Sequence, residues 1–177
     1  MRFLLASALA MALSSPGCTK DAGGVASAPS APAGAPKDAA HTGAAAAASA
    51  AKGPRVLLPS GKAISLELAR SDEEKGQGLM YRESMPADSG MVFLFDKPEP
   101  RAFWMKNCHF PLDIVFTLKD GTVVGIQPRA MPCRAEPCAT YPSQAPADTV
   151  VELNGGLAAA NGVAIGAKLR FLDVPER

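Results

Sequence analysis

The sequence of 177 residues is poor in the features that mark nucleic-acid-binding proteins. It contains one Trp and two Tyr, and its 18 basic residues against 17 acidic ones give a formal net charge of +1. Such a chain offers neither the positive field nor the row of aromatic rings that holds a nucleic acid strand. We therefore expect no nucleic-acid partner.

Motifs for catalysis and for metal binding are also lacking. The only histidines are His41 and His109, and the sequence has no His-x-x-x-His or Cys-x-x-Cys pattern that would bind a metal ion. No Ser or Cys stands in a nucleophile-elbow sequence. We therefore assign no catalytic residue, no metal ligand and no cofactor.

No apolar stretch is long enough to cross a bilayer, which takes about 20 residues. The stretch Phe3–Leu13 follows Arg2 and precedes small residues and Cys18, in the order of a secretory signal. The small residues before Cys18 resemble a lipoprotein processing site, at which Cys18 becomes acylated, although Ser15 stands where Leu is usual. The alternative is ordinary cleavage nearby, which would give a soluble periplasmic protein.

Three regions follow from this composition. Residues 1–18 are predicted to be the signal peptide, and residues 19–53, nearly all Ala, Gly, Ser and Pro, a disordered tether. Residues 54–177 are predicted to form a single globular domain. Because Thr19 rather than Asp follows Cys18, resemblance to enterobacterial lipoprotein sorting predicts a periplasmic protein whose lipid anchors it to the outer membrane.

The globular region has the patterns of a mostly β domain. Apolar residues alternate over Ile64–Leu68, as in a half-buried strand, and occupy every position of Met91–Phe95, as in a strand covered on both faces. Ser71 with Glu74 predicts the start of a short helix that ends before Met80. Asp120-Gly121 predicts a tight hairpin turn with two positive-φ residues. Further strands are expected at Val56–Leu58, Phe103–Met105, Leu112–Leu118, Val123–Ile126, Thr149–Leu153 and Lys168–Leu172, a long loop at Pro128–Pro146 and a second helix at Gly156–Ala160.

These elements add up to an α+β fold: a compact, mostly β domain of about seven or eight short strands with two short helices. In the run Phe103–Met105, we expect Phe103 and Met105 to share one face and Trp104 to lie on the other, because strand side chains alternate.

Several phrases resemble a known family in their order and spacing. They are Gly78-Leu79-Met80-Tyr81-Arg82, Phe103-Trp104-Met105-Lys106-Asn107, Pro111-Leu112-Asp113-Ile114-Val115-Phe116 and Val150-Val151-Glu152-Leu153-Asn154-Gly155-Gly156. Between about Ile64 and Leu172 the chain resembles the domain-of-unknown-function family number 192. The resemblance implies a compact, mostly β domain, often secreted, with no established activity, cofactor or partner. Cys108 is a departure, since the family usually has Thr there.

Two cysteines lie five positions apart in a proline-bounded loop. In an oxidising compartment, Cys133 and Cys138 are expected to form a structural disulfide, with redox exchange as the alternative. Cys108 should then remain a buried thiol.

Polar residues on loops between apolar strands are candidates for a binding site. An anionic or carbohydrate-like ligand could receive hydrogen bonds from cationic side chains and stack on Trp104. The alternative is structural: Asn107 and Asp113 cap turns, and Arg82 pairs with a carboxylate. The candidate residues are Arg82, Trp104, Lys106, Asn107 and Asp113.

The sequence therefore favours an exported, tethered envelope domain that binds an unknown ligand or envelope protein without catalysing a reaction. One alternative is a hydrolase-like envelope enzyme that uses Asp113 or Cys108. Another is a soft-metal protein that binds copper through its methionines with Cys108 and His109.

Overall fold

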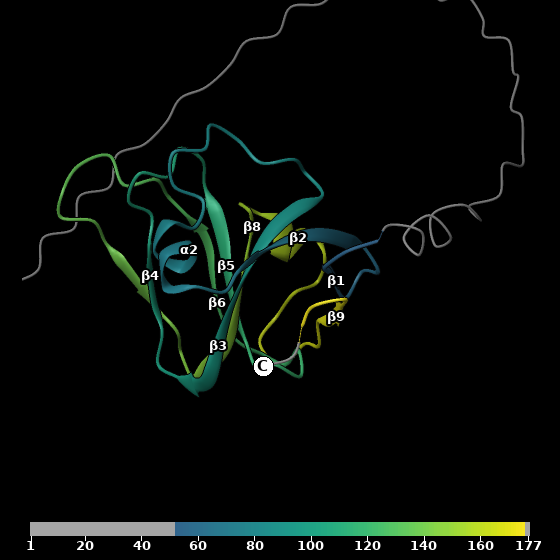
Figure 1. Ribbon diagram of the computed structural model, residues 1–177. Helices are drawn as coiled ribbons and strands as arrows, with labels where there is room; N and C mark the ends of the chain where they lie inside the picture. The colour runs from purple at the N-terminus through teal and green to yellow at the C-terminus, as the bar shows by residue number, and fades with distance from the viewer. Residues whose placement is uncertain (1–51, 176–177) are drawn as a thin grey trace, which may run out of the picture. The chain divides into compact units, whose positions relative to one another are not determined.

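The computed structural model describes residues 52–175 (Figure 1). The signal segment, Cys18 and nearly all of the tether fall outside the described residues. Within residues 52–175, neither helix has the length and apolar character needed to span a bilayer.

The described part of the chain has the expected α+β, mostly β composition, with nine strands rather than seven or eight. In chain order the elements are β1 (Arg55–Leu57), β2 (Ala63–Ala69), α2 (Asp72–Gln77), β3 (Ser89–Glu99), β4 (Ala102–Trp104), β5 (Leu112–Thr117), β6 (Val123–Ala130), β7 (Thr140–Pro142), β8 (Ala147–Asn154), α3 (Leu157–Ala160) and β9 (Arg170–Leu172).

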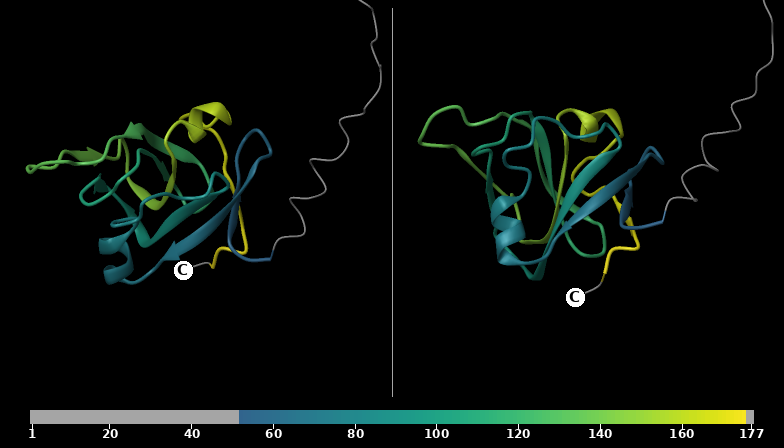
Figure 2. Two further views of the ribbon diagram at one scale, coloured as in Figure 1. Left: turned by 90° about the horizontal axis from the view of Figure 1, so that it is seen from above. Right: turned by 45° about the horizontal axis from the view of Figure 1, so that its top comes forward.

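Seven of the strands form one curled sheet in the order β6-β5-β8-β3-β2-β1-β9 (Figures 1 and 2). Only β2 and β3 are parallel; the other neighbours are antiparallel. The start of β6 meets the segment before β9, where Val123 N–H donates to the Ala167 carbonyl at 2.9 Å and Leu169 N–H to the Gly121 carbonyl at 2.9 Å. These bonds bring the two ends of the sheet together and cover strand edges that would otherwise be open for pairing.

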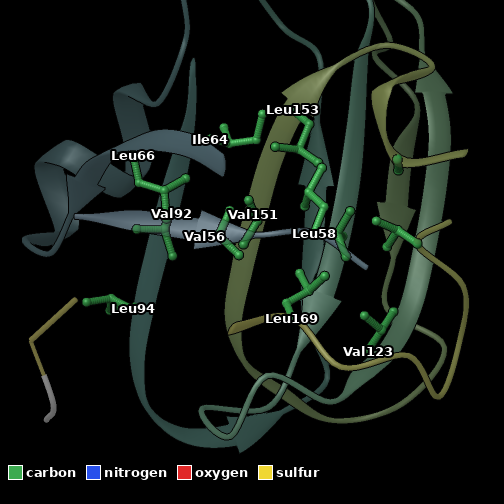
Figure 3. Close-up of a cluster of buried hydrophobic side chains, with 13 residues drawn as sticks. Val56, Leu58, Ile64, Leu66, Val92, Leu94, Val123, Val151, Leu153 and Leu169 are labelled. Atoms are coloured by element: carbon green, nitrogen blue, oxygen red, sulfur yellow. The ribbon is translucent and has the colours of Figure 1, made fainter. Parts of the chain in front are cut away.

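One hydrophobic core fills the inside of the curled sheet (Figure 3). Ile64 and Leu66 of β2 face Val92 of β3, and Val151 and Leu153 of β8 complete its centre. The alternation predicted for Ile64–Leu68 is therefore confirmed at its buried positions.

A second core lies against the outer face of β3, β5 and β8, under a layer that includes β4, β7 and the segment after α2. Phe93 and Phe116 contribute from the sheet, and Phe103 contributes from β4. The Phe103 ring packs edge-on against Phe93 at 5.0 Å and against Phe116 at 5.9 Å. Strand β3 is thus buried on both faces over Gly90–Leu94, as its unbroken apolar run predicted.

Helix α2 begins and ends as the sequence predicted. The Ser71 hydroxyl accepts a hydrogen bond from Glu74 N–H at 3.1 Å, and the Glu74 carboxylate accepts one from Ser71 N–H at 2.9 Å. This reciprocal pair satisfies N–H groups that have no partner within the helix. The helix stops at Gly78, whose φ of 48° favours glycine.

The turn between β5 and β6 differs from the prediction in one respect. Gly121 has φ 85°, but Asp120 is not a positive-φ residue. Gly121 N–H donates to the Leu118 carbonyl and Leu118 N–H to the Thr122 carbonyl, so the loop has three residues, with the left-handed glycine last. Asp120 instead accepts a hydrogen bond from Thr122 N–H at 2.9 Å. A side chain on Gly121 would clash with the Leu169 carbonyl, so the turn also permits closure of the sheet.

The region 128–146 is more ordered than the predicted long loop. Strand β6 continues to Ala130 beside β5, and Thr140–Pro142 form β7, which pairs with β4. The pairing of β7 with β4 could not be read from local sequence, because the two strands lie far apart along the chain.

The carboxylate of Asp113 ties β5 to α3. Asp113 is fully buried, and its Oδ1 accepts hydrogen bonds from the N–H groups of Arg129 and Gly156, both at 2.8 Å. Its Oδ2 accepts from Gly156 N–H at 2.9 Å and Ala158 N–H at 2.8 Å. The side chain thus joins β5, the end of β6 and the start of α3.

We expect Asp113→Asn to destabilise the domain by about 2–4 kcal/mol. In this variant the side-chain NH₂ group would face backbone N–H groups, and charge-assisted hydrogen bonds would be lost at a buried site. Urea unfolding measures the loss. Asp88→Asn, at an exposed position, is the matched control and should change stability by less than about 0.5 kcal/mol. Equal stability of the two variants would contradict the structural role of Asp113.

Candidate functional site

A pocket of about 260 Å³ lies between the sheet and the layer over its outer face. Its lining comprises Lys75–Met80, the three residues of β4, Phe93 and Phe95 of β3, Cys108, and Glu152 of β8. We call this the Glu152 pocket. Helix α2 and its C-terminal turn supply one wall, and β4 supplies another.

Glu152 is the acid of this pocket, and the sequence analysis did not select it. Its neighbours in the sheet are Met91 of β3 and Ile114 of β5, and its side chain is 5% exposed. Because Val151 and Leu153 point into the inner core, alternation directs Glu152 to the outer face. Within residues 52–175 its carboxyl group has no hydrogen-bond or ion-pair partner. Burial raises the pKa of Glu152 to about 8, so the group is mostly protonated at neutral pH.

Cys108 lines the same pocket as a free, buried thiol, as predicted. The pKa of Cys108 is raised to about 11, mainly by burial and to a smaller extent by the nearby Glu152. Such a thiol is almost entirely protonated at neutral pH and is a poor nucleophile.

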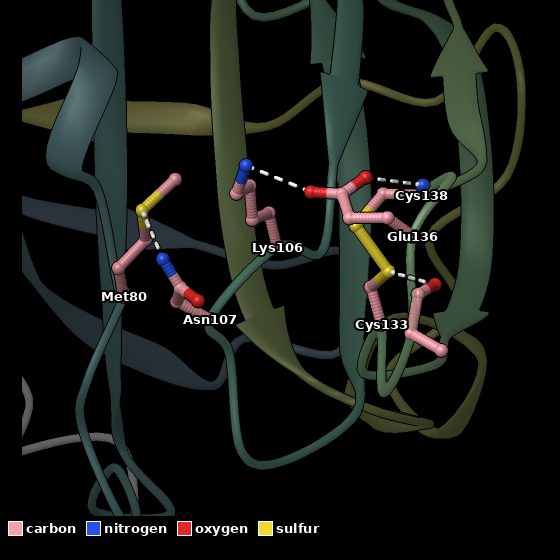
Figure 4. Close-up of a disulfide and its surroundings, with 7 residues drawn as sticks. Met80, Lys106, Asn107, Cys133, Glu136 and Cys138 are labelled. Carbon is pink, nitrogen blue, oxygen red and sulfur yellow. Dashed lines mark hydrogen bonds and ion pairs between the residues drawn. A yellow bond between two sulfur atoms is a disulfide. The ribbon is translucent and has the colours of Figure 1, made fainter.

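Trp104 lines the pocket, and Lys106 lies over the Trp104 ring. Trp104 is 46% exposed, while Met105 is buried and Phe103 packs on the outer core, so the predicted alternation is confirmed. The Lys106 ammonium lies 5.4 Å from the Trp104 ring centre and 2.7 Å from a carboxylate oxygen of Glu136 (Figure 4). The hydrogen bond to Glu136 and, second, the negative charge of Glu136 raise the pKa of Lys106.

Asn107 connects the segment after β4 to the segment after α2. Its side-chain amide donates to the Tyr81 hydroxyl at 2.8 Å and lies 3.9 Å from the Met80 sulfur, as Figure 4 shows for Met80. Tyr81 N–H donates to the Asn107 carbonyl at 2.8 Å. Both residues have positive φ, 64° for Tyr81 and 56° for Asn107. The amide of Asn107 therefore positions Met80 and Tyr81 beside the pocket.

The two other candidates have their own protein partners. Arg82 donates two hydrogen bonds to the Glu67 carboxylate, at 2.6 and 2.8 Å, and the hydrogen bond is the main cause that lowers the pKa of Glu67. Asp113 is held by backbone N–H groups at α3 and does not line the pocket. The structure brings Trp104, Lys106 and Asn107 together and leaves Arg82 and Asp113 in the structural roles considered as alternatives.

Cys133 and Cys138 form the predicted disulfide (Figure 4). Cys133 N–H donates to the Met105 carbonyl at 3.0 Å, so the cross-linked loop is attached to the segment after β4. Glu136 lies within this loop, which places the carboxylate that binds Lys106.

A larger, open hollow of about 820 Å³ shares Phe95 with the Glu152 pocket. Its buried acid, Asp148, accepts a hydrogen bond from the Thr149 hydroxyl at 3.1 Å. The smaller pocket is the stronger candidate, because Glu152, unlike Asp148, has no partner among the described residues.

The model of DUF192, a family described as "Uncharacterized ACR", matches residues 55–171. The chain belongs to the DUF192 family. A search of curated proteins finds no match.

Two solved structures resemble this DUF192 protein. A Sinorhizobium meliloti 1021 protein, described as a candidate transcription regulator, is 37% identical over 68% of this chain and 93% of its own, with a TM-score of 0.60. A protein of unknown function from Novosphingobium aromaticivorans DSM 12444 is 35% identical over 72% of this chain and 99% of its own, with a TM-score of 0.64.

The raised pKa of Glu152 predicts how the stability of this DUF192 domain depends on pH. The unfolded chain loses the Glu152 proton near its ordinary pKa of 4.5, whereas the folded domain keeps it to about pH 8. Between these values the folded state binds the extra proton, so raising the pH favours unfolding by up to about tenfold per pH unit from this group. Glu152→Gln should match the wild type near pH 4 and become progressively more stable than it up to about pH 8.

Urea unfolding between about pH 4 and pH 9 measures this difference. Glu73→Gln, which makes the same change at an exposed position of α2, should follow the wild type throughout. A constant difference between Glu152→Gln and wild type would show that Glu152 ionises normally in the folded domain.

Proposed function

We propose that this DUF192 protein is a non-catalytic binding protein of the cell envelope whose domain binds a small ligand in the Glu152 pocket. The observation that supports the proposal is the unpartnered carboxyl group at a pocket wall formed otherwise largely by apolar side chains. Burying a polar group without a hydrogen bond costs stability. A ligand that bonds to this group offsets the cost, so the arrangement suits binding.

The state of the possible nucleophiles supports binding over hydrolysis. With a pKa of about 11, roughly one Cys108 thiol in ten thousand is ionised at neutral pH. The carboxylate of Asp113 is occupied by backbone N–H groups and lies outside the pocket lining. Neither residue of the hydrolase-like alternative is therefore prepared to attack a substrate.

The copper alternative has weaker support. Met80 and Cys108 both line the pocket, but Met85, Met91 and Met105 pack in the outer core. In the part of the chain that the structure describes, no three His, Cys, Asp or Glu residues are grouped to hold a metal ion. His109 instead contacts Glu83 at 2.9 Å.

The order of the first 53 residues supports the envelope location. We propose that residues 1–18 direct export, that acylated Cys18 anchors the protein to the outer membrane, and that residues 19–53 hold the domain in the periplasm. Removing Arg2 with the signal leaves 17 basic and 17 acidic residues (18 − 1 = 17). This balance argues against nucleic acid as the ligand, so the description of the Sinorhizobium relative is not extended to this chain.

Blocking the pocket tests the binding proposal. Ala102 of β4 is an exposed alanine of the pocket lining, so Ala102→Phe should fill the entrance while keeping the fold. In a fragment screen by NMR, we expect binders of the wild type to shift the Trp104 indole signal and to lose affinity at least about tenfold with Ala102→Phe. Ala160→Phe, at an exposed position of α3, should bind as the wild type does. A screen without binders sensitive to Ala102→Phe would reject the pocket.

The anchor is tested separately in cells. Cys18→Ser removes the only acylation site that we propose, so the variant should move from the outer-membrane fraction to the soluble periplasm. Immunoblotting of the separated fractions measures the change. Cys108→Ser leaves Cys18 in place and should remain with the membrane. If Cys18→Ser stayed there too, the lipoprotein proposal would be wrong.

A further inference from the structure

We propose that the Glu152 pocket binds a small organic cation of the alkylammonium class, which forms an ion pair with the Glu152 carboxylate between aromatic walls. The inference rests on the proposed binding function and names its ligand class. It follows from three features of the pocket: its aromatic lining, its single unpaired acid and its size.

The rings around the pocket are suited to a cation. Phe93, Phe95, Phe103 and Trp104 all contribute to the lining, whereas Glu152 is its only acidic residue. The negative face of an aromatic ring attracts ammonium groups, most strongly where water is excluded. A carboxylate beside such rings adds a full negative charge, which forms an ion pair with a cation but not with a neutral ligand.

The protein already places its own ammonium groups over two of these rings. The Lys75 ammonium lies 4.9 Å from the centre of Phe95, and the Lys106 ammonium lies 5.4 Å from the centre of Trp104. Each lysine is paired with another carboxylate, Lys75 with Asp72 at 3.7 Å and Lys106 with Glu136 at 2.7 Å. The rings therefore accept cations, while Glu152 receives none from the described residues.

An ammonium group suits the needs of the Glu152 carboxyl group. Both oxygens lack a donor within residues 52–175, and an alkylammonium ion offers up to three N–H donors together with a positive charge. The cavity of about 260 Å³ is smaller than the roughly 300–1,000 Å³ of pockets for drug-sized ligands. We therefore expect a short alkylammonium ion rather than a large amine.

Binding is coupled to a proton, because the carboxyl group is neutral when the pocket is empty at neutral pH. The carboxylic acid of Glu152 gives up its proton to solvent, and the resulting carboxylate pairs with the ligand ammonium, so one proton is released for each cation bound. The other titratable groups that line the pocket are Lys75 of α2 and Cys108, and Lys106 lies over the ring of Trp104. Cys108 keeps its proton between pH 6 and 8 because its pKa is about 11, and pairing with Glu136 raises the pKa of Lys106 further above this range. The neighbours on β3 and β5, Met91 and Ile114, do not titrate.

The single tryptophan gives a direct assay. We would titrate the purified protein with n-butylammonium chloride at constant ionic strength and follow Trp104 fluorescence. The expected result is saturable binding whose dissociation constant falls about tenfold between pH 6 and 7 and becomes constant above about pH 8. Butylammonium stays charged over this range. Proton release in weakly buffered solution should approach one per cation at pH 6.

Two variants and two further probes separate the possible outcomes. Glu152→Gln should bind butylammonium at least tenfold more weakly and without pH dependence, and Glu73→Gln should behave as the wild type. Binding of 1-butanol equal to that of butylammonium, or tighter binding of butyrate, overturns the cation inference while leaving the pocket a binding site. Absence of saturation by butylammonium also overturns it. The proposed binding function fails only if, in addition, the fragment screen yields no ligand that Ala102→Phe excludes.

Discussion

Strand β8 is hydrogen-bonded to β3 on one side and β5 on the other, and both of its faces are covered. Val151 and Leu153 fill the inside of the curled sheet, whereas Val150 and Glu152 point to the outer face. The two-residue period of a strand therefore fixes the surroundings of every side chain on β8. A buried acid in this strand needs either a partner or a proton. Glu152, at the pocket wall, has no partner among residues 52–175 and keeps its proton at neutral pH.

Much of the fold follows from local sequence. The capping box at Ser71, the alternation in β2 and the apolar run in β3 each act within a few residues, so the pattern and the structure agree. The short β7 strand could not be predicted in this way, because it depends on pairing with β4, which is some 40 residues earlier in the chain. The prediction of a positive φ for Asp120 is wrong, because the turn at Gly121 has three loop residues rather than two.

The candidate site was predicted only in part, and for a physical reason. Sequence favoured polar residues on loops, which led to Trp104 and Lys106 but also to Arg82 and Asp113, whose partners lie at least 15 positions away. Glu152 was missed because a single charged residue in a strand ordinarily faces water. A signal was nevertheless present: Thr149–Leu153 is apolar around Glu152 much as Met91–Phe95 is throughout, which indicates a strand covered on both faces.

The pocket lies between the curled sheet and the layer over its outer face, and these two parts of the domain are held together differently. The layer over the outer face contains two three-residue strands, β4 and β7, and one short helix, while the curled sheet carries the long strands and its own inner core. Regions held by few backbone pairs open locally at a lower free energy than the whole domain. The layer over the outer face should therefore open more readily than the curled sheet, so that amide hydrogens of β4 and β7 exchange faster than those of β8.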